Sequence, residues 1–174
     1  MLAISAYEKQ LVSFGSRYDE YLSDRKHKTL TFSELKGEQF FLKNCSHCHV
    51  VYSKEKSILN NNVENNYSVS DVVDMSDLGL YETTKIEADK HKFRVPTLRN
   101  IALTAPYFHN GSVEKLEIAM LHSKPTIDAV EKKALLLFLN TLTDSTIFTN
   151  PLFRKLQIIE KTIAPSQPSP RGKE

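Results

Sequence analysis

The pattern Cys-Ser-His-Cys-His at residues 45–49 constrains this chain more than any other feature of its sequence. One helical turn brings two cysteines three positions apart to the same side, where their thiols can bond the two vinyl groups of a porphyrin, and the histidine that follows lies beneath the iron. A neutral imidazole is a strong axial ligand of haem iron. The sequence therefore predicts one covalently bound haem c, attached through Cys45 and Cys48, with His49 as the proximal ligand.

Zinc binding and thiol redox chemistry are alternative uses of the same residues. A structural zinc site takes about four ligands in tetrahedral geometry. Cys45, Cys48 and either His47 or His49 could supply three, but no second Cys or His pair at finger-like spacing follows. A thioredoxin-like pair needs a βαβ context, whereas the flanking residues have helix and loop patterns. A disulfide between the two cysteines would close too short a loop to stabilise the fold much. These comparisons favour haem.

Length and charge place the chain among the globular proteins. Its 174 residues are enough for one hydrophobic core and an additional arm, and a formal net charge of +2 gives no reason to expect a nucleic-acid partner. No apolar run reaches the roughly 20 residues that span a bilayer. The first residues lack the basic start and longer apolar stretch of a secretion signal. Covalent haem attachment in bacteria nevertheless leads us to expect a periplasmic protein. We therefore expect this sequence either to be the mature chain or to lack its front.

A helix is predicted to run into the haem motif. Thr31 and Glu34 have the spacing of a capping box, and apolar residues with helical periodicity follow them. Gly37 lies inside this helix, where glycine costs about 1 kcal/mol relative to alanine. We therefore expect another helix to cross closely at Gly37, with an aromatic side chain such as Phe41 filling the adjacent space. An earlier helix, broken around Gly15, is expected at the N-terminus.

Two further helices are predicted in the second half of the chain. Ser112 is a candidate cap for a helix with apolar residues on one face. The last helix begins near Thr126 or Asp128 and ends near Leu142. We expect this last helix to be the one that crosses the helix leading into the haem motif.

The segment 92–100 is the second informative stretch. Pro96 restricts its own backbone and that of Val95, and Arg94 and Arg99 lie on either side of it. A guanidinium group, with five donors in a fixed geometry, suits an anionic group such as a haem propionate. Arg94 and Arg99 are therefore candidate propionate contacts, and a surface salt bridge is the equal alternative.

Four stretches together resemble the bacterial dihaem cytochrome c peroxidases, a family that includes the MauG-type enzymes. They are residues 37–41, 45–49, 77–79 and 93–112, of which the last is long and highly specific. The resemblance covers about residues 3–153 and only the C-terminal half of the family, the half that is similar to a class I cytochrome c and holds the electron-relay haem. The half with the peroxide-reacting haem has no counterpart in this sequence.

The resemblance implies an all-α, class I cytochrome c-like domain with an N-terminal linking helix and a long loop over the haem. We divide the chain into an interdomain-type helix and linker (1–28), a haem domain (29–153) and a tail (154–174). Asparagine clusters between residues 60 and 66 indicate where the loop lies. The proline-rich composition of the tail cannot bury enough apolar surface to order the chain, so we expect disorder there.

The resemblance also assigns roles to individual residues. Cys45 and Cys48 match the cysteines that form the haem thioethers, and His49 matches the proximal ligand. The backbone carbonyls of Thr104 and Pro106 match positions that help hold a calcium ion between the two domains of the family. Carbonyl oxygens are ordinary calcium ligands, so calcium is a candidate second cofactor.

The distal iron ligand is the point at which this sequence departs from the family. A methionine takes this role in the peroxidases and a tyrosine in the MauG-type members, but counting along without gaps places Ser123 there, a poor iron ligand. His122 after a small register shift, or Met120 after a rotation of the helix, could replace it; water or an open site is the third alternative. Taken alone, His122 fits a polar helix end and Met120 fits core packing. The choice matters because a thioether raises the haem potential relative to a second imidazole.

These observations predict the electron-transfer domain of a dihaem cytochrome c peroxidase. It would accept electrons from a small donor such as a cytochrome and pass them to a peroxidatic haem domain in a missing half or a separate chain; a homodimer is a further candidate assembly. The alternatives are a stand-alone monohaem cytochrome c carrier and a degenerate fragment that never matures. The N-terminal helix favours the peroxidase, because a similar segment links the two domains in the family. Because the peroxide-reacting iron is missing, we expect little peroxide turnover from this chain alone. His109 is the one candidate acid–base group near this haem, and the corresponding residue in the family belongs to the domain boundary.

Overall fold

The computed structural model describes residues 4–6, 9, 13–49, 67–69, 76–122 and 126–151. Residues 14–144 form one compact unit, which contains the candidate site. Residues 1–13 and 145–174 belong to a second unit, in which the 3₁₀ helix η3 spans Ser145–Phe148. Ser123, residues 50–66 and 70–75 of the expected long loop, and the tail from 154 lie outside the described residues. None of the described helices is long and apolar enough to cross a membrane.

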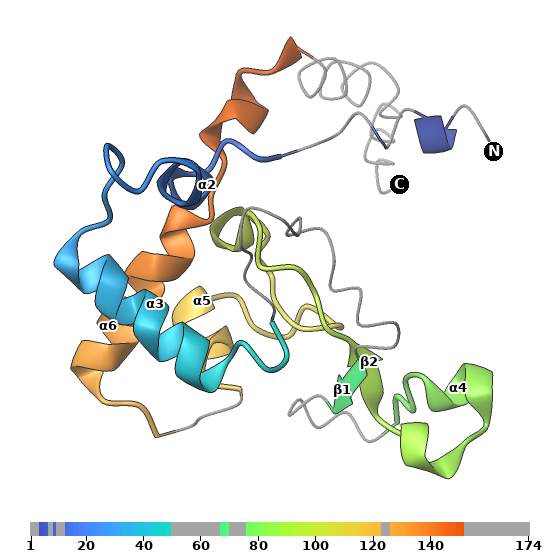
Figure 1. Ribbon diagram of the computed structural model, residues 1–174. Coiled ribbons are helices and arrows are strands. Elements are labelled where there is room, and N and C mark those ends of the chain that lie inside the picture. The colour runs from blue at the N-terminus through green and yellow to red at the C-terminus, as the bar shows by residue number, and fades with distance from the viewer. Residues whose placement is uncertain are drawn as a thin grey trace, which may run out of the picture. The chain divides into compact units, whose positions relative to one another are not determined.

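The unit formed by residues 14–144 is mostly helical (Figure 1). Its elements are α2 (Arg17–Ser23), α3 (Phe32–Asn44), β1 (Tyr67–Val69), α4 (Tyr81–Thr84), η1 (Glu87–Asp89), β2 (Lys92–Arg94), η2 (Ile101–Leu103), α5 (Leu116–Ala119) and α6 (Ala129–Thr141). Strands β1 and β2 pair antiparallel, and they form the one sheet among the described residues. The helical prediction is therefore correct in the main, but this small sheet was not expected, because strands of three residues have too few positions for a periodic pattern.

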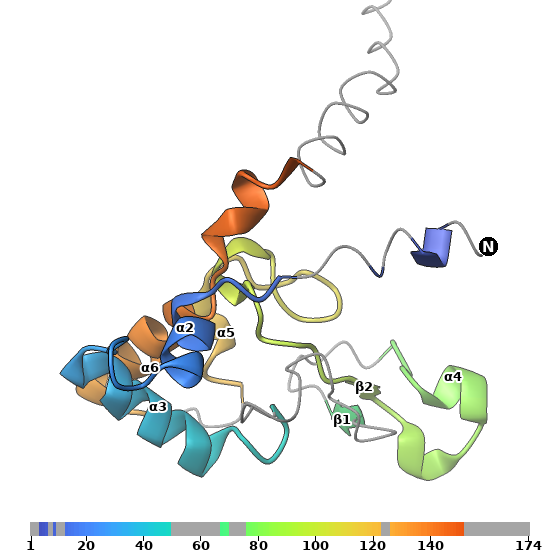
Figure 2. The same ribbon diagram turned by 45° about the horizontal axis from the view of Figure 1, so that its top comes forward.

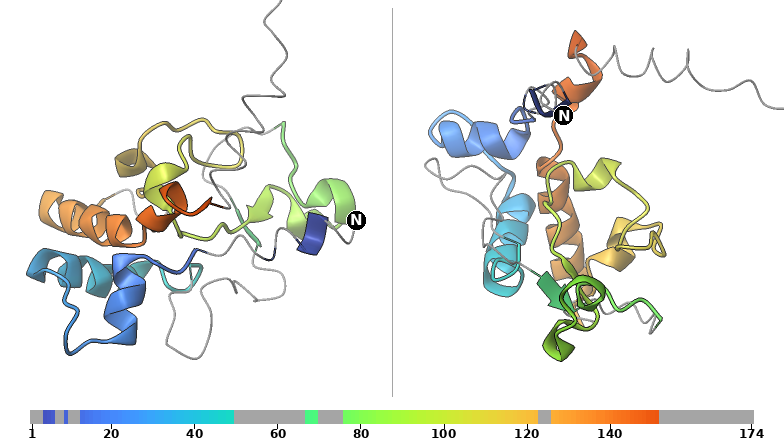
Figure 3. Two further views of the ribbon diagram at one scale, coloured as in Figure 1. Left: turned by 90° about the horizontal axis from the view of Figure 1, so that it is seen from above. Right: turned by 90° about the vertical axis from the view of Figure 1, so that its right-hand side faces the viewer.

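Helices α3 and α6 pack against each other and form the centre of the core, and they lie side by side in both views of Figure 3. They meet at Gly37, where an added Cβ would overlap the backbone carbonyl of Ala134 and lie 2.7 Å from the Cβ of Phe138. Phe41 lies one helical turn after Gly37 on α3. It is 1% exposed, and the centre of its ring lies 5.3 Å from that of Phe138. The predicted crossing at Gly37 is confirmed, and the cost of an interior glycine is explained by the close approach of two backbones.

Both long helices begin at the caps that the sequence predicts. The Thr31 side chain accepts a hydrogen bond from the Glu34 backbone N–H, and the Glu34 carboxylate accepts one from the Thr31 N–H at 2.7 Å. At the start of α6, Asp128 Oδ1 accepts from the N–H groups of Val130 and Glu131, each at 2.8 Å. Such caps satisfy donors that have no partner within the helix.

The prediction that a helix begins after Ser112 is wrong. Helix α5 begins only at Leu116, after Lys115, whose side chain makes no capping hydrogen bond. The Ser112 N–H instead donates to Asn110 Oδ1 at 3.1 Å, and Val113 forms a β-bridge with Tyr107, whose N–H donates to the Val113 carbonyl at 2.7 Å. Two residues of the expected first turn are therefore held in an extended loop.

Helix α2 lies next to α3 and α6 (Figure 2). It packs on the core through Tyr18, which is 2% exposed. The Tyr18 ring meets Phe138 edge-on at 5.1 Å, and its hydroxyl donates to Glu38 Oε1 at 2.7 Å. The buried carboxylate of Asp144 accepts a hydrogen bond from the N–H of Gly15 at 3.0 Å. The predicted break around Gly15 thus lies directly before α2, which packs against the core.

Candidate functional site

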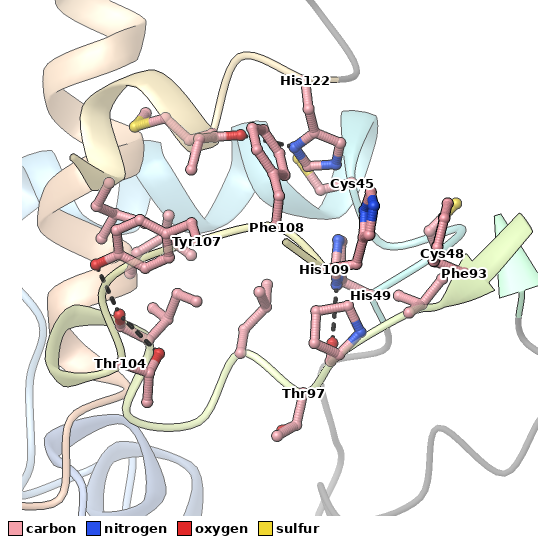
Figure 4. Close-up of a pocket in the computed structure, with 18 of the residues that line it drawn as sticks. Cys45, Cys48, His49, Phe93, Thr97, Thr104, Tyr107, Phe108, His109 and His122 are labelled. Carbon is pink, nitrogen blue, oxygen red and sulfur yellow. Dashed lines mark hydrogen bonds between the residues drawn. The ribbon is translucent and has the colours of Figure 1, made fainter. Parts of the chain in front are cut away.

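A cavity of about 900 Å³ opens beside the turn that follows α3 (Figure 4). Its walls come from this turn, from the segment 93–109 and from the segment 116–122, with Leu139 of α6 behind them. The lining is mostly apolar, and the volume is within the range of about 300–1,000 Å³ that is usual for small-molecule and cofactor sites. A flat apolar group with a few polar attachment points fits such a space.

The Cys-x-x-Cys-His motif forms a single turn on one wall of this cavity. Cys45 ends α3, and the backbone N–H groups of Cys48 and His49 donate to its carbonyl at 3.1 and 2.9 Å. The turn places Cys45, Cys48 and His49 together in the lining. No disulfide joins the two thiols. The residues that the sequence predicts as the two thioether cysteines and the proximal ligand therefore share one site.

His49 is prepared for metal binding by its hydrogen bond and by its burial. Its Nδ1 lies 3.3 Å from the carbonyl oxygen of Pro96, and because a carbonyl only accepts, this contact assigns the proton to Nδ1 and the lone pair to Nε2. Burial and the nearby His122 lower the pKa of His49 to about 4, although the Pro96 carbonyl acts in the opposite direction. The imidazole is consequently neutral at neutral pH, which is the form that binds iron.

His122 lies across the cavity from His49. The two ring centres are 5.9 Å apart and the ring planes are nearly perpendicular, at 86°. His122 Nδ1 lies 2.8 Å from the carbonyl oxygen of Ala119, and the ring of Phe108 flanks it edge-on. Met120, the other distal candidate, also lines the cavity but is 8% exposed and belongs to the apolar core cluster.

The two arginines have different surroundings. Arg94 is exposed and lines the cavity, where an anionic group could reach it. Arg99 is buried and outside the lining, and its guanidinium donates to both oxygens of Asp19, at 2.6 and 2.8 Å. Burial alone would raise the pKa of Asp19, but the hydrogen bonds from Arg99 and Ser16 hold it below its ordinary value. Of the Arg99 donors, Nε is buried and has no partner in the described structure.

The calcium candidates lie at the edge of the same cavity. Thr104 and Pro106 are exposed and belong to its lining. The Thr104 hydroxyl donates to the carbonyl of Ile101 at 3.2 Å. In the described part of the chain, no three His, Cys, Asp or Glu side chains converge in a way that could hold a metal ion. A calcium ion here would therefore depend on backbone carbonyls and water.

His109 and Phe93 form a stacked pair at the cavity wall, of which the sequence predicted only His109 as a candidate functional residue. The ring of His109 lies flat on that of Phe93, with centres 3.7 Å apart and planes at 13°. His109 Nε2 is 3.5 Å from the carboxylate of Asp77. His109 was a candidate from its type, but its two partners lie 16 and 32 positions away with no pattern to connect them. The chain path that brings Phe93 and Asp77 to His109 could not be derived from periodicity.

The cavity and its donors fit a haem group. Two thiols one turn apart, a buried neutral imidazole and apolar walls are what covalent haem attachment requires, and the exposed guanidinium of Arg94 suits the acidic edge of the porphyrin. A zinc site needs about four such ligands, whereas not even three His, Cys, Asp or Glu side chains converge in the part of the chain that is described.

Comparison with curated proteins finds cytochrome c peroxidases. The chain is 36% identical over 120 residues to cytochrome c peroxidase Ccp of Escherichia coli (strain K12), a match that covers 68% of this chain and 25% of that protein. It is 35% identical over 153 residues to cytochrome c551 peroxidase of Nitrosomonas europaea, which covers 81% and 43%. The methylamine utilization protein MauG of Paracoccus denitrificans is 28% identical over 138 residues, covering 68% and 35%.

The solved structures give a consistent result. A MauG-like protein associated with microbial copper homeostasis superposes with a TM-score of 0.72 and 31% sequence identity, covering 87% of this chain and 54% of that chain. No protein-family model matches the chain. The chain spans between a quarter and less than half of the length of these three curated relatives.

Proposed function

We propose that this chain, which belongs to the family of the cytochrome c peroxidases and MauG, is the electron-relay haem domain of a two-haem peroxidase. The observation that carries the proposal is the cavity in which Cys45, Cys48 and His49 lie together, in a chain with a cytochrome c-like fold. The chain has two cysteines, so it can attach one haem through thioethers.

Each residue of the site has a separate task. Cys45 and Cys48 would attach the haem c, and His49 would hold the iron through Nε2 while the Pro96 carbonyl fixes the orientation of the ring. The apolar walls exclude water, which limits reorganisation of the surroundings when the charge of the site changes. Arg94, which lines the cavity, would neutralise a propionate. Arg99 lies outside the lining and already binds Asp19, so only its Nε remains for such a contact. The bound haem supplies one-electron redox chemistry.

The partners follow from this role. A small redox protein such as a cytochrome would supply the electrons, and a peroxidatic haem domain, in the rest of a longer chain or in a separate one, would consume them. Calcium held by the carbonyls of Thr104 and Pro106 would lie toward that domain. The same proposal divides the chain into a linker (1–28), a haem domain (29–153) and a tail (154–174), with a long loop over the haem. It also includes a periplasmic location and a homodimer.

Haem attachment tests the first half of the proposal. The chain is expressed in the periplasm with the haem-attachment machinery, and the purified protein is examined by a pyridine haemochrome assay and a reduced-minus-oxidised spectrum. We expect one covalent haem per chain, and its loss in the Cys45→Ser, Cys48→Ser double variant. A wild-type chain that carries no covalent haem under these conditions would refute the haem site itself.

Turnover tests the second half. A relay domain should be reduced by a cytochrome or dye donor yet turn over hydrogen peroxide well below the enzyme-like rate of about 1 per second, because peroxide cleavage needs an open iron with positioned acid–base groups. Faster turnover by this chain alone would contradict the relay assignment. A stand-alone carrier behaves alike in this assay, so the deciding observation is a second Cys-x-x-Cys-His in the DNA directly upstream; its absence would favour the carrier.

A further inference from the structure

We infer that His122 is the second axial ligand of the haem iron, opposite His49, so that this chain has bis-histidine ligation. The inference rests on the proposed haem site and adds the ligand that the sequence left open among His122, Met120 and an open position. It departs from the methionine or tyrosine that the resemblance to the peroxidase family implies. Figure 4 shows His122 above and His49 below, with their imidazoles turned toward each other.

The separation of the two rings fits one iron between them. A metal–imidazole bond is about 2 Å long, so two such bonds, plus about 1 Å from each ring centre to its nitrogen, require ring centres about 6 Å apart. The observed distance between the centres of His49 and His122 is 5.9 Å. Edge-on ring pairs in general have centres about 4.5–7 Å apart, so the distance agrees with one bridging iron, and the hydrogen bonds of the two rings carry the rest of the argument.

The hydrogen bonds of both rings leave the required nitrogen available. Nδ1 of His49 faces the Pro96 carbonyl at 3.3 Å, and Nδ1 of His122 faces the Ala119 carbonyl at 2.8 Å, as the dashed lines of Figure 4 show. Because a carbonyl cannot donate, both Nδ1 atoms carry the proton and both Nε2 atoms keep their lone pairs. Metal-binding histidines characteristically donate their other ring N–H in this way.

The other candidates in the cavity have competing roles. Met120 is packed in the apolar core cluster at 8% exposure, so its thioether already fills space between helices. The His109 ring is stacked on Phe93, with its Nε2 toward the Asp77 carboxylate. His47 belongs to the same turn as His49 and therefore lies on the proximal side. Among these, His122 alone faces His49 ring to ring.

Two measurable properties follow from this ligation. Two strong-field imidazoles give a six-coordinate, low-spin iron, and the ring planes at 86° predict the strongly anisotropic low-spin EPR signal of perpendicular imidazoles rather than the rhombic signal of parallel ones. A second imidazole also gives a lower reduction potential than a thioether. The relay would consequently be a weaker oxidant than one that carries a methionine ligand.

The test uses the haem-loaded full chain and its His122→Ala variant. Wild type is expected to be low-spin, without the weak red charge-transfer band of thioether ligation, and slow to bind carbon monoxide when reduced. H122A is expected to become high-spin and to bind carbon monoxide readily, and added imidazole should restore the low-spin spectrum. His122→Met should raise the midpoint potential. Because the His122 residue is exposed, H122A should fold.

Three control variants separate His122 from its neighbours. Met120→Leu, His109→Ala and the distant exposed His27→Ala should all keep the wild-type low-spin spectrum. A low-spin H122A without added imidazole, or a high-spin M120L or H109A, would overturn the inference. Each of these results presupposes covalent haem in the haemochrome assay, so failure of the distal ligand is distinguishable from failure of the haem site.

Discussion

Replacing Gly37 by alanine should destabilise the fold, although alanine is the better helix former. The perturbation is one methyl group at the crossing of α3 and α6. Alanine gains about 1 kcal/mol over glycine inside a helix. Its Cβ would overlap the Ala134 carbonyl, however, and the nearest side-chain atom, the Phe138 Cβ, would be only 2.7 Å away. The nearest obstacle is the backbone of Ala134, which cannot rotate out of the way as a flexible side chain could.

The magnitude follows from these two opposing terms. Forcing extra atoms into a packed core costs about 1–3 kcal/mol and occasionally more. We place Gly37→Ala at or above the upper end of this range, because α3 and α6 would have to separate over their whole contact. After the helix-propensity gain is subtracted, the net loss is about 2 kcal/mol or more. For a chain of this size such a loss lowers the melting temperature by about 4–8 °C.

The assay is denaturant and thermal unfolding of the haem-loaded chain, followed by far-UV circular dichroism. Lys36→Ala, an exposed change on the same helix, is the matched control and should stay within about 0.5 kcal/mol of wild type. Ala134→Gly should not rescue Gly37→Ala, because the overlap is with the carbonyl of residue 134 rather than its side chain. A Gly37→Ala chain as stable as wild type would refute the close crossing.

Two further predictions concern the ion pair of Arg99 and the cap of α6. Asp19→Asn should cost about 3–5 kcal/mol at neutral pH, because it leaves a buried guanidinium unpaired. The pKa of Asp19 is lowered by folding, so its contribution is complete above the unfolded pKa near 4 and is lost as the pH falls through the folded value; unfolding curves of variant and wild type should therefore converge in acid. A deficit that is constant down to pH 2 would contradict this pairing. Asp128→Ala should lower stability by about 1 kcal/mol in the same assay, with Glu131→Ala, which removes neither hydrogen bond, as the control; an unchanged Asp128→Ala chain would contradict the cap.

The features that the sequence predicted correctly are those whose causes are local. The caps at Thr31 and Asp128 need only residues two or three positions away. The crossing at Gly37 was also predictable, because an interior glycine is costly unless something occupies the space of its missing side chain.

The features that the sequence did not predict depend on residues far apart in the chain. Ser112 has the composition of a cap, but the bridge between Tyr107 and Val113 determines the local backbone instead. Arg99 has the chemistry of a propionate contact, yet Asp19, 80 positions earlier, binds its guanidinium. Likewise, only Met120 and Leu121 lie between the end of α5 and His122, whose ring contacts the Ala119 carbonyl, and counting along a related sequence cannot give this orientation.

The crossing of the two long helices connects the stability of the fold to the proposed iron site. His49 lies in the turn that continues α3, and His122 follows α5, which packs against α6. We therefore expect the distance between the two imidazoles to depend on how closely α3 approaches α6, an approach that the missing side chain of Gly37 permits. If an alanine at residue 37 moves α3 away from α6, the rings of His49 and His122 should move apart as well, beyond the span that one iron can bridge.

The Gly37→Ala chain should then lose the second axial ligand before it unfolds, and its spectrum should shift from low spin toward the carbon-monoxide-binding form expected of His122→Ala. A Gly37→Ala chain that is destabilised but stays fully low-spin up to its unfolding transition would show that the ligand distance is held by the loops instead.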